Sequence, residues 1–358
     1  MIGLSLLPTR HRSFATTAVF AFSASLFASA AAATADMAKV QEFFAQLHAK
    51  GEFNGSVLIA DASGIQFHAA YGLANEETRA KLEPDTPHRI ASVTKGFTAV
   101  LALQAAERGE IDLDARMLTH FPGLDRPPLA GITIRHLLTH SSGLVDFAPT
   151  FRDGDSLGAA LTRALATAEV AFPPGAKFAY VNVGYTIVSH MLELATKRSY
   201  AELLQERILK PAGMEATYID IGGNLTRPRA LGYEPKNGAL VLNEESDLMR
   251  FTGAGGIVST TGDLHRFSRA LAGDALLSAA NRKLLQTPQK DRYAMGCAIM
   301  TTPTGEVAQL FLGNMPSTSA VLARFNDGQW TIIILSNRYR VPLNRLIPQV
   351  HRLLPTAP

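Results

Sequence analysis

Residues 87–98 have the sequence PHRIASVTKGFT, in which Ser92-Val93-Thr94-Lys95 forms an S-x-x-K pattern before an apolar, helix-favouring run. Because side chains three residues apart share one face of a helix, the Lys95 amine can reach the Ser92 hydroxyl. A serine needs an adjacent base to act as a nucleophile, and a lysine can be that base when burial lowers its pKa. Taken alone, the pattern also fits a helix N-cap serine followed by a solvent-exposed lysine.

A second segment, residues 172–185, has the sequence FPPGAKFAYVNVGY and predicts a loop that leads into a helix. A phenol beside an ammonium group ionises more easily and can relay a proton, which makes Tyr180 a candidate catalytic residue. The amide of Asn182, two residues further on, can bind both a substrate carbonyl and the lysine. The alternative is that Tyr180 packs in the core and Asn182 caps the helix.

The apolar pattern predicts an α+β fold. Residues 36–48 have apolar side chains at helical spacing, and residues 57–71 predict a hairpin around the turn at 61–64. Strand signals nearly vanish from residue 92 to about residue 290, where helical patterns cover 97–108, 134–139, 157–170, 183–197, 201–209 and 261–271. Strands return at 307–312, 320–325 and 331–335, the last two joined by Asn326-Asp327-Gly328, before an amphipathic stretch at 343–354. We therefore expect one antiparallel sheet built from both ends of the chain, flanked by helices, with a mostly helical region inserted.

The first 35 residues have the layout of a bacterial secretory signal. Arg10 and Arg12 precede an uncharged run over 14–33, and Ala33-Thr34-Ala35 offers a small-x-small cleavage site. The alternatives are an uncleaved anchor, which the weakly hydrophobic run disfavours, and an N-terminus without fixed structure. We expect an exported, periplasmic protein with no stable membrane insertion after cleavage. Loss of the two arginines would take the net charge from +3 to +1.

The composition excludes several classes of protein. The 358 residues are 47% hydrophobic and 18% charged, as in ordinary globular chains. With 34 basic and 31 acidic side chains and no basic block, a nucleic-acid-binding groove is not expected. Cys297 is the single cysteine, so the chain forms no internal disulfide, and no Cys/His cluster has zinc-finger spacing. We expect no metal and no organic cofactor.

Several blocks together resemble the serine β-lactamase-related superfamily, in the branch of class C β-lactamases, D-Ala-D-Ala carboxypeptidases and related esterases. The S-x-x-K pattern is one of its marks. The blocks occur in the family's order along nearly the whole chain after residue 35: residues 87–98 (PHRIASVTKGFT), 134–144 (IRHLLTHSSGL), 180–185 (YVNVGY), 255–264 (GGIVSTTGDL) and 332–337 (IIILSN).

The resemblance implies a β-lactamase-like domain over residues 36–358, with an α/β part at 36–90 and 291–358 and a helical part at 91–290. It also implies acyl transfer, in which Ser92 attacks a carbonyl, forms an acyl-enzyme and contributes its N–H to the oxyanion hole. Lys95 and Tyr180 would share the proton handling, and Asn182 would orient the substrate. The sequence leaves open whether Lys95 or Tyr180 is the base.

The third family motif departs from the usual pattern. Where relatives carry Lys-Thr-Gly or His-x-Gly, residues 311–319 have the sequence FLGNMPSTS, so Phe311 stands at the position of the cation. Gly313 is kept, which would let the strand approach the substrate, and the N–H of Asn314 would be the second oxyanion donor. Without the cation, a substrate carboxylate loses a charge-assisted bond, which favours an uncharged ester or amide. The alternative is that Lys177 or Arg324 supplies the charge from elsewhere.

Three other motifs predict structural roles. Gly154-Asp155-Ser156-Leu157-Gly158 matches G-x-S-x-G, but no strand precedes it, so we expect Ser156 in a loop or as an N-cap. His136 and His140 have the i, i+4 spacing of a zinc pair, but Leu137 stands where a zincin has glutamate, and we expect a structural role. The Gly-rich residues 253–256 lack a P-loop lysine and are expected to line the cleft.

The prediction is a secreted serine hydrolase whose partner is a small-molecule ester, amide or peptide substrate. One alternative is a D-Ala-D-Ala carboxypeptidase or β-lactamase that acts on peptidoglycan-like substrates. The other is a penicillin-binding module with little turnover.

Overall fold

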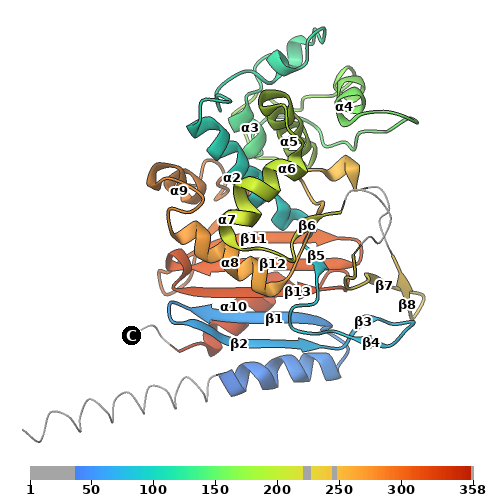
Figure 1. The fold of residues 1–358 in the computed structure, drawn as a ribbon, viewed down its shortest axis with the longest axis vertical. Helices are drawn as coiled ribbons and strands as arrows, with labels where there is room; N and C mark the ends of the chain where they lie inside the picture. The colour runs from blue at the N-terminus through green and yellow to red at the C-terminus, as the bar shows by residue number, and fades with distance from the viewer. Residues whose placement is uncertain (1–36, 221–226, 244–247, 356–358) are drawn as a thin grey trace, which may run out of the picture.

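The computed structural model describes residues 37–220, 227–243 and 248–355 (Figure 1). The predicted signal, residues 1–35, lies outside these described residues. Within the described part, none of the helices combines the length and the apolar character that a membrane crossing requires.

A six-stranded antiparallel sheet in the order β10-β11-β12-β13-β1-β2 forms the base of the molecule (Figure 1). Early and late strands meet in register, with Val57 of β1 opposite Ile334 of β13. The predicted sheet from both ends of the chain is therefore confirmed, with β10 as a strand that the sequence did not predict. The bounds are β1 Gly55–Asp61, β2 Gly64–Tyr71, β10 Ala298–Thr301, β11 Val307–Met315, β12 Thr318–Phe325 and β13 Trp330–Ser336.

Both faces of this sheet are covered, which explains why its central strands are apolar at nearly every position. Val57 and Ile59 pack in one cluster with the helical residues 37–49 and with α10 (Leu343–Leu353). Leu58 and Ala60, on the opposite face, belong to the main core with α8 (Thr261–Ala272). The main core continues from there into the inserted helices.

The inserted region has helices at all six predicted positions. The predicted helix 157–170 ends at Leu165, and the second half of 201–209 is a π-helical turn, Gln205–Leu209. The bounds are α2 Thr94–Glu107, α3 Ile134–Leu138, α4 Leu157–Leu165, α5 Val183–Thr196, α6 Tyr200–Leu204 and α8. Two further helices, α7 Lys210–Ala212 and α9 Ala279–Gln286, were not predicted. Short strands that sequence patterns did not predict lie before this region and within it. Those before it are β3 Leu73–Asn75, β4 Ala80–Lys81 and β5 His88–Arg89, and those within it are β6 Tyr218–Ile219, β7 Tyr233–Lys236, β8 Ala239–Leu242 and β9 Ile257–Ser259. Strands of two to four residues are too short to show an alternating pattern.

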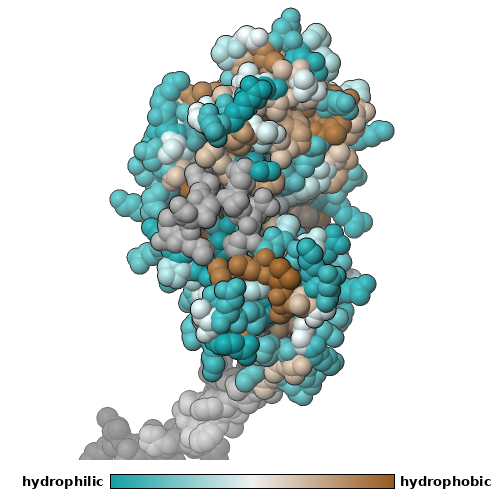
Figure 2. All heavy atoms as spheres, turned by 90° about the vertical axis from the view of Figure 1, so that its right-hand side faces the viewer, coloured by the Kyte–Doolittle hydropathy of each residue, from teal (hydrophilic) through white to brown (hydrophobic). Residues whose placement is uncertain are grey.

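The β7–β8 hairpin places an apolar band on the surface. Leu240, Val241 and Leu242 are 46%, 40% and 41% exposed. Figure 2 shows brown side chains in this part of the face, in largely hydrophilic surroundings. The hairpin lies at the same end of the molecule as β3 and β4 (Figure 1).

Candidate active site

Ser92 lies in a short 3-10 turn, η1 (Ala91–Val93), directly before α2. The residue at the N-cap position of α2 is Val93, so Ser92 is not the helix cap that its sequence also allowed. Ala91 has a φ of +46°, in the left-handed region that L-residues avoid, which marks a strained turn at this point. Ser92 is partly exposed, so its hydroxyl lies where a substrate can reach it.

Lys95 is completely buried and its amine contacts three oxygen atoms. Its Nζ lies 2.9 Å from Ser92 Oγ, 2.9 Å from Asn182 Oδ1 and 2.9 Å from the carbonyl oxygen of Ala254. Burial lowers the pKa of Lys95 to about 7, against a smaller opposing effect of the Asp146 charge. This lysine is therefore not the solvated side chain of the alternative interpretation, and a large fraction of it is neutral near pH 7.

Tyr180 joins this pair from the loop before α5 (Val183–Thr196). Its ring centroid lies 4.9 Å from Lys95 Nζ, and its hydroxyl interacts with Ser92. Although the residue is 44% exposed, burial at its hydroxyl raises the pKa of Tyr180 to about 12, and the hydrogen bond with Ser92 opposes this only in part. The phenol is therefore protonated at neutral pH.

Asn182 occupies the N-cap position of α5, but its side chain makes no capping bond. Its Oδ1 accepts from Lys95, while its Nδ2 donates to Asp146 Oδ2 over 3.0 Å. The Asp146 carboxylate also accepts from the backbone N–H groups of Asn182 and Val183, at 2.8 and 3.0 Å. Asp146 thus caps the helix and fixes the orientation of the Asn182 amide.

Asp146 belongs to the site but was not predicted from the sequence. Its carboxylate lies 36 residues before Asn182 in the chain, in a loop without a motif of its own. One signal in the sequence could have indicated it. Asp146 lies in a loop two residues after the block that ends at Leu144, and polar side chains in loops often have a catalytic or binding role.

Gly313 brings the edge of β11 against the nucleophile. β10 pairs with β11 only from Val307 to Leu310, so within the described part of the chain the following residues of β11 have no strand on that side. A Cβ on Gly313 would lie 2.3 Å from the carbonyl oxygen of Ile90 and 3.0 Å from the Ser92 nitrogen. Only glycine allows this approach, which places the neighbouring Asn314 beside the Ser92 backbone.

Phe311, at the position of the missing cation, is fully buried rather than directed at a substrate. It packs against Gly96, where a Cβ would lie 2.5 Å from the Phe311 ring, and edge-on against Phe267 at 6.3 Å. Arg324 does not replace the cation, because it is 1% exposed and binds Gln309 and Ser268 at the other end of the strand. Lys177 is exposed, and none of the described contacts links it to Ser92.

The remaining motifs have the expected structural roles. Ser156 caps α4 by accepting from the Ala159 N–H at 3.2 Å. His136 forms a capping box with Thr133 at the start of α3, and no group of three or more potential metal ligands occurs among the described residues. The Gly-rich segment at 253–256 lines the site, where it provides the Ala254 carbonyl to the lysine.

His140 packs against Tyr180 and binds the backbone next to it. Its buried ring accepts from the Val181 N–H at 3.2 Å and lies 4.2 Å from the Tyr180 ring. Burial and the nearby Lys95 charge hold the pKa of His140 well below its ordinary value, so the imidazole is neutral. His136 and His140 therefore serve separate structural purposes.

A serine, a buried lysine of lowered pKa and a tyrosine that meet at the edge of an antiparallel sheet define a serine hydrolase of the β-lactamase-like type. The Beta-lactamase family matches residues 40–352, and the chain belongs to this family.

Similar proteins include Penicillin-binding protein 4* of Bacillus subtilis (strain 168), which is 29% identical over 84% of this chain and 71% of the relative. Protein flp of Staphylococcus aureus (strain MRSA252) is 24% identical, and its match spans 80% of this chain and 60% of that protein. The octameric penicillin-binding protein homologue from Pyrococcus abyssi shares the fold, with a TM-score of 0.76, 22% identity and coverage of 89% and 79%. The D-amino acid amidase from Ochrobactrum anthropi SV3, complexed with D-phenylalanine, has a TM-score of 0.72, 23% identity and coverage of 85% and 94%.

Proposed function

We propose that the protein is an exported acyl hydrolase that forms an acyl-enzyme on Ser92 and acts on ester or amide substrates. The observation that carries the proposal is the set of partners around Lys95 Nζ. The Asn182 Oδ1 and Ala254 carbonyl oxygens can only accept hydrogen bonds, whereas the Ser92 hydroxyl can also donate. A neutral lysine therefore donates its two N–H groups to the acceptors and turns its lone pair to Ser92, which makes Lys95 the base for acylation.

Tyr180 takes the complementary role. With its pKa raised to about 12, its hydroxyl holds a proton at neutral pH and can donate it. In the proposed reaction, Ser92 Oγ bonds to the substrate carbonyl carbon as its proton passes to Lys95. Tyr180 then relays this proton from Lys95 to the leaving oxygen or nitrogen as its bond to the carbonyl carbon breaks. Water attacks the remaining Ser92 ester and releases the acyl group by the reverse sequence.

The backbone N–H groups of Ser92 and Asn314 would bind the developing oxyanion. The close approach of Gly313 to the Ser92 nitrogen supports this assignment, because it holds the two backbone segments side by side. The buried Phe311 supports a substrate that is uncharged next to the cleaved bond. A charge-assisted hydrogen bond contributes about 1.5–3 kcal/mol, which would otherwise favour a carboxylate there.

The test compares hydrolysis of 4-nitrophenyl butyrate by the purified protein with that of benzylpenicillin. We expect the ester to be cleaved much faster, with loss of activity in Ser92→Ala and Lys95→Ala. Fast penicillin turnover beside slow ester cleavage would contradict the substrate assignment. Ester cleavage that survives Ser92→Ala would contradict the nucleophile.

The similarity to Penicillin-binding protein 4* of B. subtilis supports a second candidate, acylation of Ser92 by penicillin with little turnover. A labelling time course with fluorescent penicillin separates the two. A stable label without ester hydrolysis supports the second candidate, a label that decays quickly supports a β-lactamase, and ester hydrolysis without labelling supports the first.

A further inference from the structure

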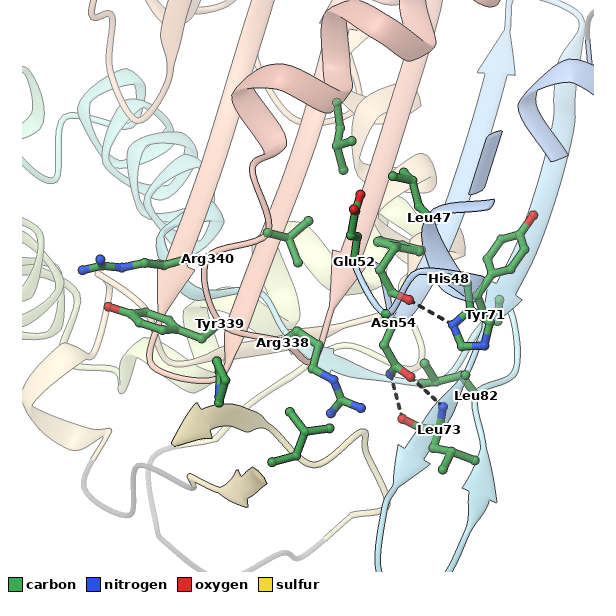
Figure 3. A pocket seen from close by; sticks show the side chains of 18 of the residues that line it. Leu47, His48, Glu52, Asn54, Tyr71, Leu73, Leu82, Arg338, Tyr339 and Arg340 are labelled. Carbon is green, nitrogen blue, oxygen red and sulfur yellow. Dashed lines mark hydrogen bonds between the residues drawn. The ribbon is translucent and has the colours of Figure 1, made fainter. Parts of the chain in front are cut away.

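Two hollows in the surface meet at the loop between β13 and α10. The larger one, of about 1180 Å³, lies between the end of the helical residues 37–49, the β3–β4 hairpin and this loop (Figure 3). The smaller one, of about 660 Å³, begins at Asn314. Both are lined by residues 339–342 and by Arg345, so they adjoin at this loop. We call the two adjoining hollows together the trough; their lining extends from Asn314 past Arg340 and Arg345 to Arg338 and Lys81.

The lining of the trough carries an excess of positive charge. Five basic side chains face two acidic ones, which are Glu52 and Glu76. Glu76 is neutralised, because it pairs with Arg79 at 3.4 Å and also with Arg338. Among the described residues, the other three cations have no carboxylate partner: Lys81, Arg340 and Arg345.

The arginines of the loop extend into both hollows of the trough. In Figure 3, Arg338 turns toward Leu73 and Leu82, whereas Arg340 extends to the opposite side together with Tyr339. The Arg338 guanidinium lies 5.2 Å from the Tyr233 ring centroid, and its buried Nη1 has no hydrogen-bond partner within the described part of the chain. The Arg340 guanidinium lies 4.8 Å from the Tyr339 ring centroid and is exposed. Exposed guanidinium groups of this kind bind carboxylates or phosphates bidentately.

We propose that the trough binds the anionic remainder of an extended substrate whose cleaved carbonyl lies at Ser92. The inference rests on the proposed function and deepens its substrate class. The trough begins at Asn314, and the preceding residue Gly313 contacts the Ser92 backbone, so a chain that leaves the catalytic serine along β11 enters it. Phe311 leaves no cation beside the cleaved bond, and negative charge is recognised further along, by Arg340 and Arg345. The ligand is a chain of several carboxylates or phosphates.

Direct binding is tested with two labelled probes, a hexaglutamate peptide and a short linear polyphosphate, by fluorescence anisotropy at low ionic strength. We expect binding of at least one probe, weakened on the order of fivefold by Arg340→Ala and by Arg345→Ala. The matched control is Lys283→Ala, which removes an exposed cation of α9 on the far side of the molecule (Figure 1) and should change affinity less than twofold. The probe that binds identifies the anion. Equal affinity of the wild type and the Arg340→Ala/Arg345→Ala double variant for both probes would overturn the proposal.

Substrate recognition is tested with the 4-nitrophenyl esters of acetyl-triglutamyl-glycine and acetyl-triglutaminyl-glycine. We expect the wild type to prefer the acidic ester about tenfold in kcat/KM, and the preference to disappear in the double variant. Equal kcat/KM values in the wild type would contradict a role of the trough in substrate binding. 4-Nitrophenyl butyrate, which does not reach the trough, should be cleaved equally by all variants. Failure of the wild type on this ester would count against the proposed function, whereas the binding assay would still report on the trough.

Discussion

Substitution of Asp146 by asparagine should shift the acid limb of the pH–rate profile to lower pH. The pKa of Lys95 is about 7, because burial lowers it more than the negative charge of Asp146 raises it. Removal of that charge should therefore let the lysine lose its proton at lower pH. Because Lys95 acts as a base only when neutral, kcat/KM of the wild type should rise with pH through about 7 and then level off.

The size of the shift follows from the path between the two groups. Lys95 Nζ lies 2.9 Å from Asn182 Oδ1, and Asn182 Nδ2 lies 3.0 Å from Asp146 Oδ2. One amide group joins these contacts, so the two charges are within about 8 Å of each other. Coulomb's law at this distance gives between about 0.5 kcal/mol in water and about 2 kcal/mol at an effective dielectric constant near 20. Asp146 is exposed to solvent, so the lower half of this energy range applies. It corresponds to a shift of the acid limb by about 0.5 to 1 pH unit.

The assay measures kcat/KM for 4-nitrophenyl butyrate between about pH 5 and pH 9 for the wild type, Asp146→Asn and Asp153→Asn. Asp153 is an exposed carboxylate of the same stretch of chain, without a described contact to the site, and its removal should leave the limb in place. The plateau should fall in Asp146→Asn, because the Asn182 amide loses its anchor. An acid limb that stays in place or moves to higher pH in Asp146→Asn would refute this account of the Lys95 environment.

Three further substitutions test the packing around the site. Gly313→Ala should lower kcat/KM at least about 100-fold. It should also lower thermal stability, because the new Cβ would lie 2.3 Å from the Ile90 carbonyl oxygen and the backbone would have to shift. Activity within tenfold of wild type would argue against the close approach. Phe311→Ala should reduce the free energy of unfolding, measured in urea titrations, by about 3–5 kcal/mol, because the ring is fully buried. A loss below about 1 kcal/mol would mean that the ring is not packed in the core. Ala91→Gly should raise the free energy of unfolding by up to about 1 kcal/mol, because glycine accepts the φ of +46° without strain, and a clear loss of stability would contradict that strain.

The sequence predicted the parts of the fold that depend on regular patterns. The strands that pack on both faces are long apolar runs, such as 331–335, and the spacing of Ser92 and Lys95 predicts their contact directly. The predicted meeting of Tyr180 and Asn182 with this pair agrees with the observed distances. The strand β10 was missed, because four residues at the edge of a sheet carry no clear alternation.

Features that depend on three-dimensional proximity could not be predicted. Asp146 has no distinguishing neighbours in the chain, and only the fold places its carboxylate at the start of α5. The trough is assembled from distant segments, so Lys81 and Arg340 are isolated cations in the sequence but line the same hollow in the structure. The burial of the Phe311 side chain could not be predicted either, because it depends on Gly96, in a helix more than 200 residues earlier in the chain.

The most direct test of the central claim is to locate the acyl group. The protein is mixed with 4-nitrophenyl butyrate, quenched in acid during the first turnover, digested with trypsin and analysed by mass spectrometry. Cleavage after Arg89 and Lys95 places Ser92 in the peptide IASVTK, whereas Ser156 falls in the separate peptide DGDSLGAALTR. We predict one butyryl group on IASVTK in the wild type. In Lys95→Ala, where the tryptic site at position 95 is lost, we predict none on the peptide 90–108 that then contains Ser92. A butyryl group on the Ser156 peptide, or undiminished acylation of Ser92 in Lys95→Ala, would contradict the assignment of Ser92 as nucleophile and Lys95 as its base.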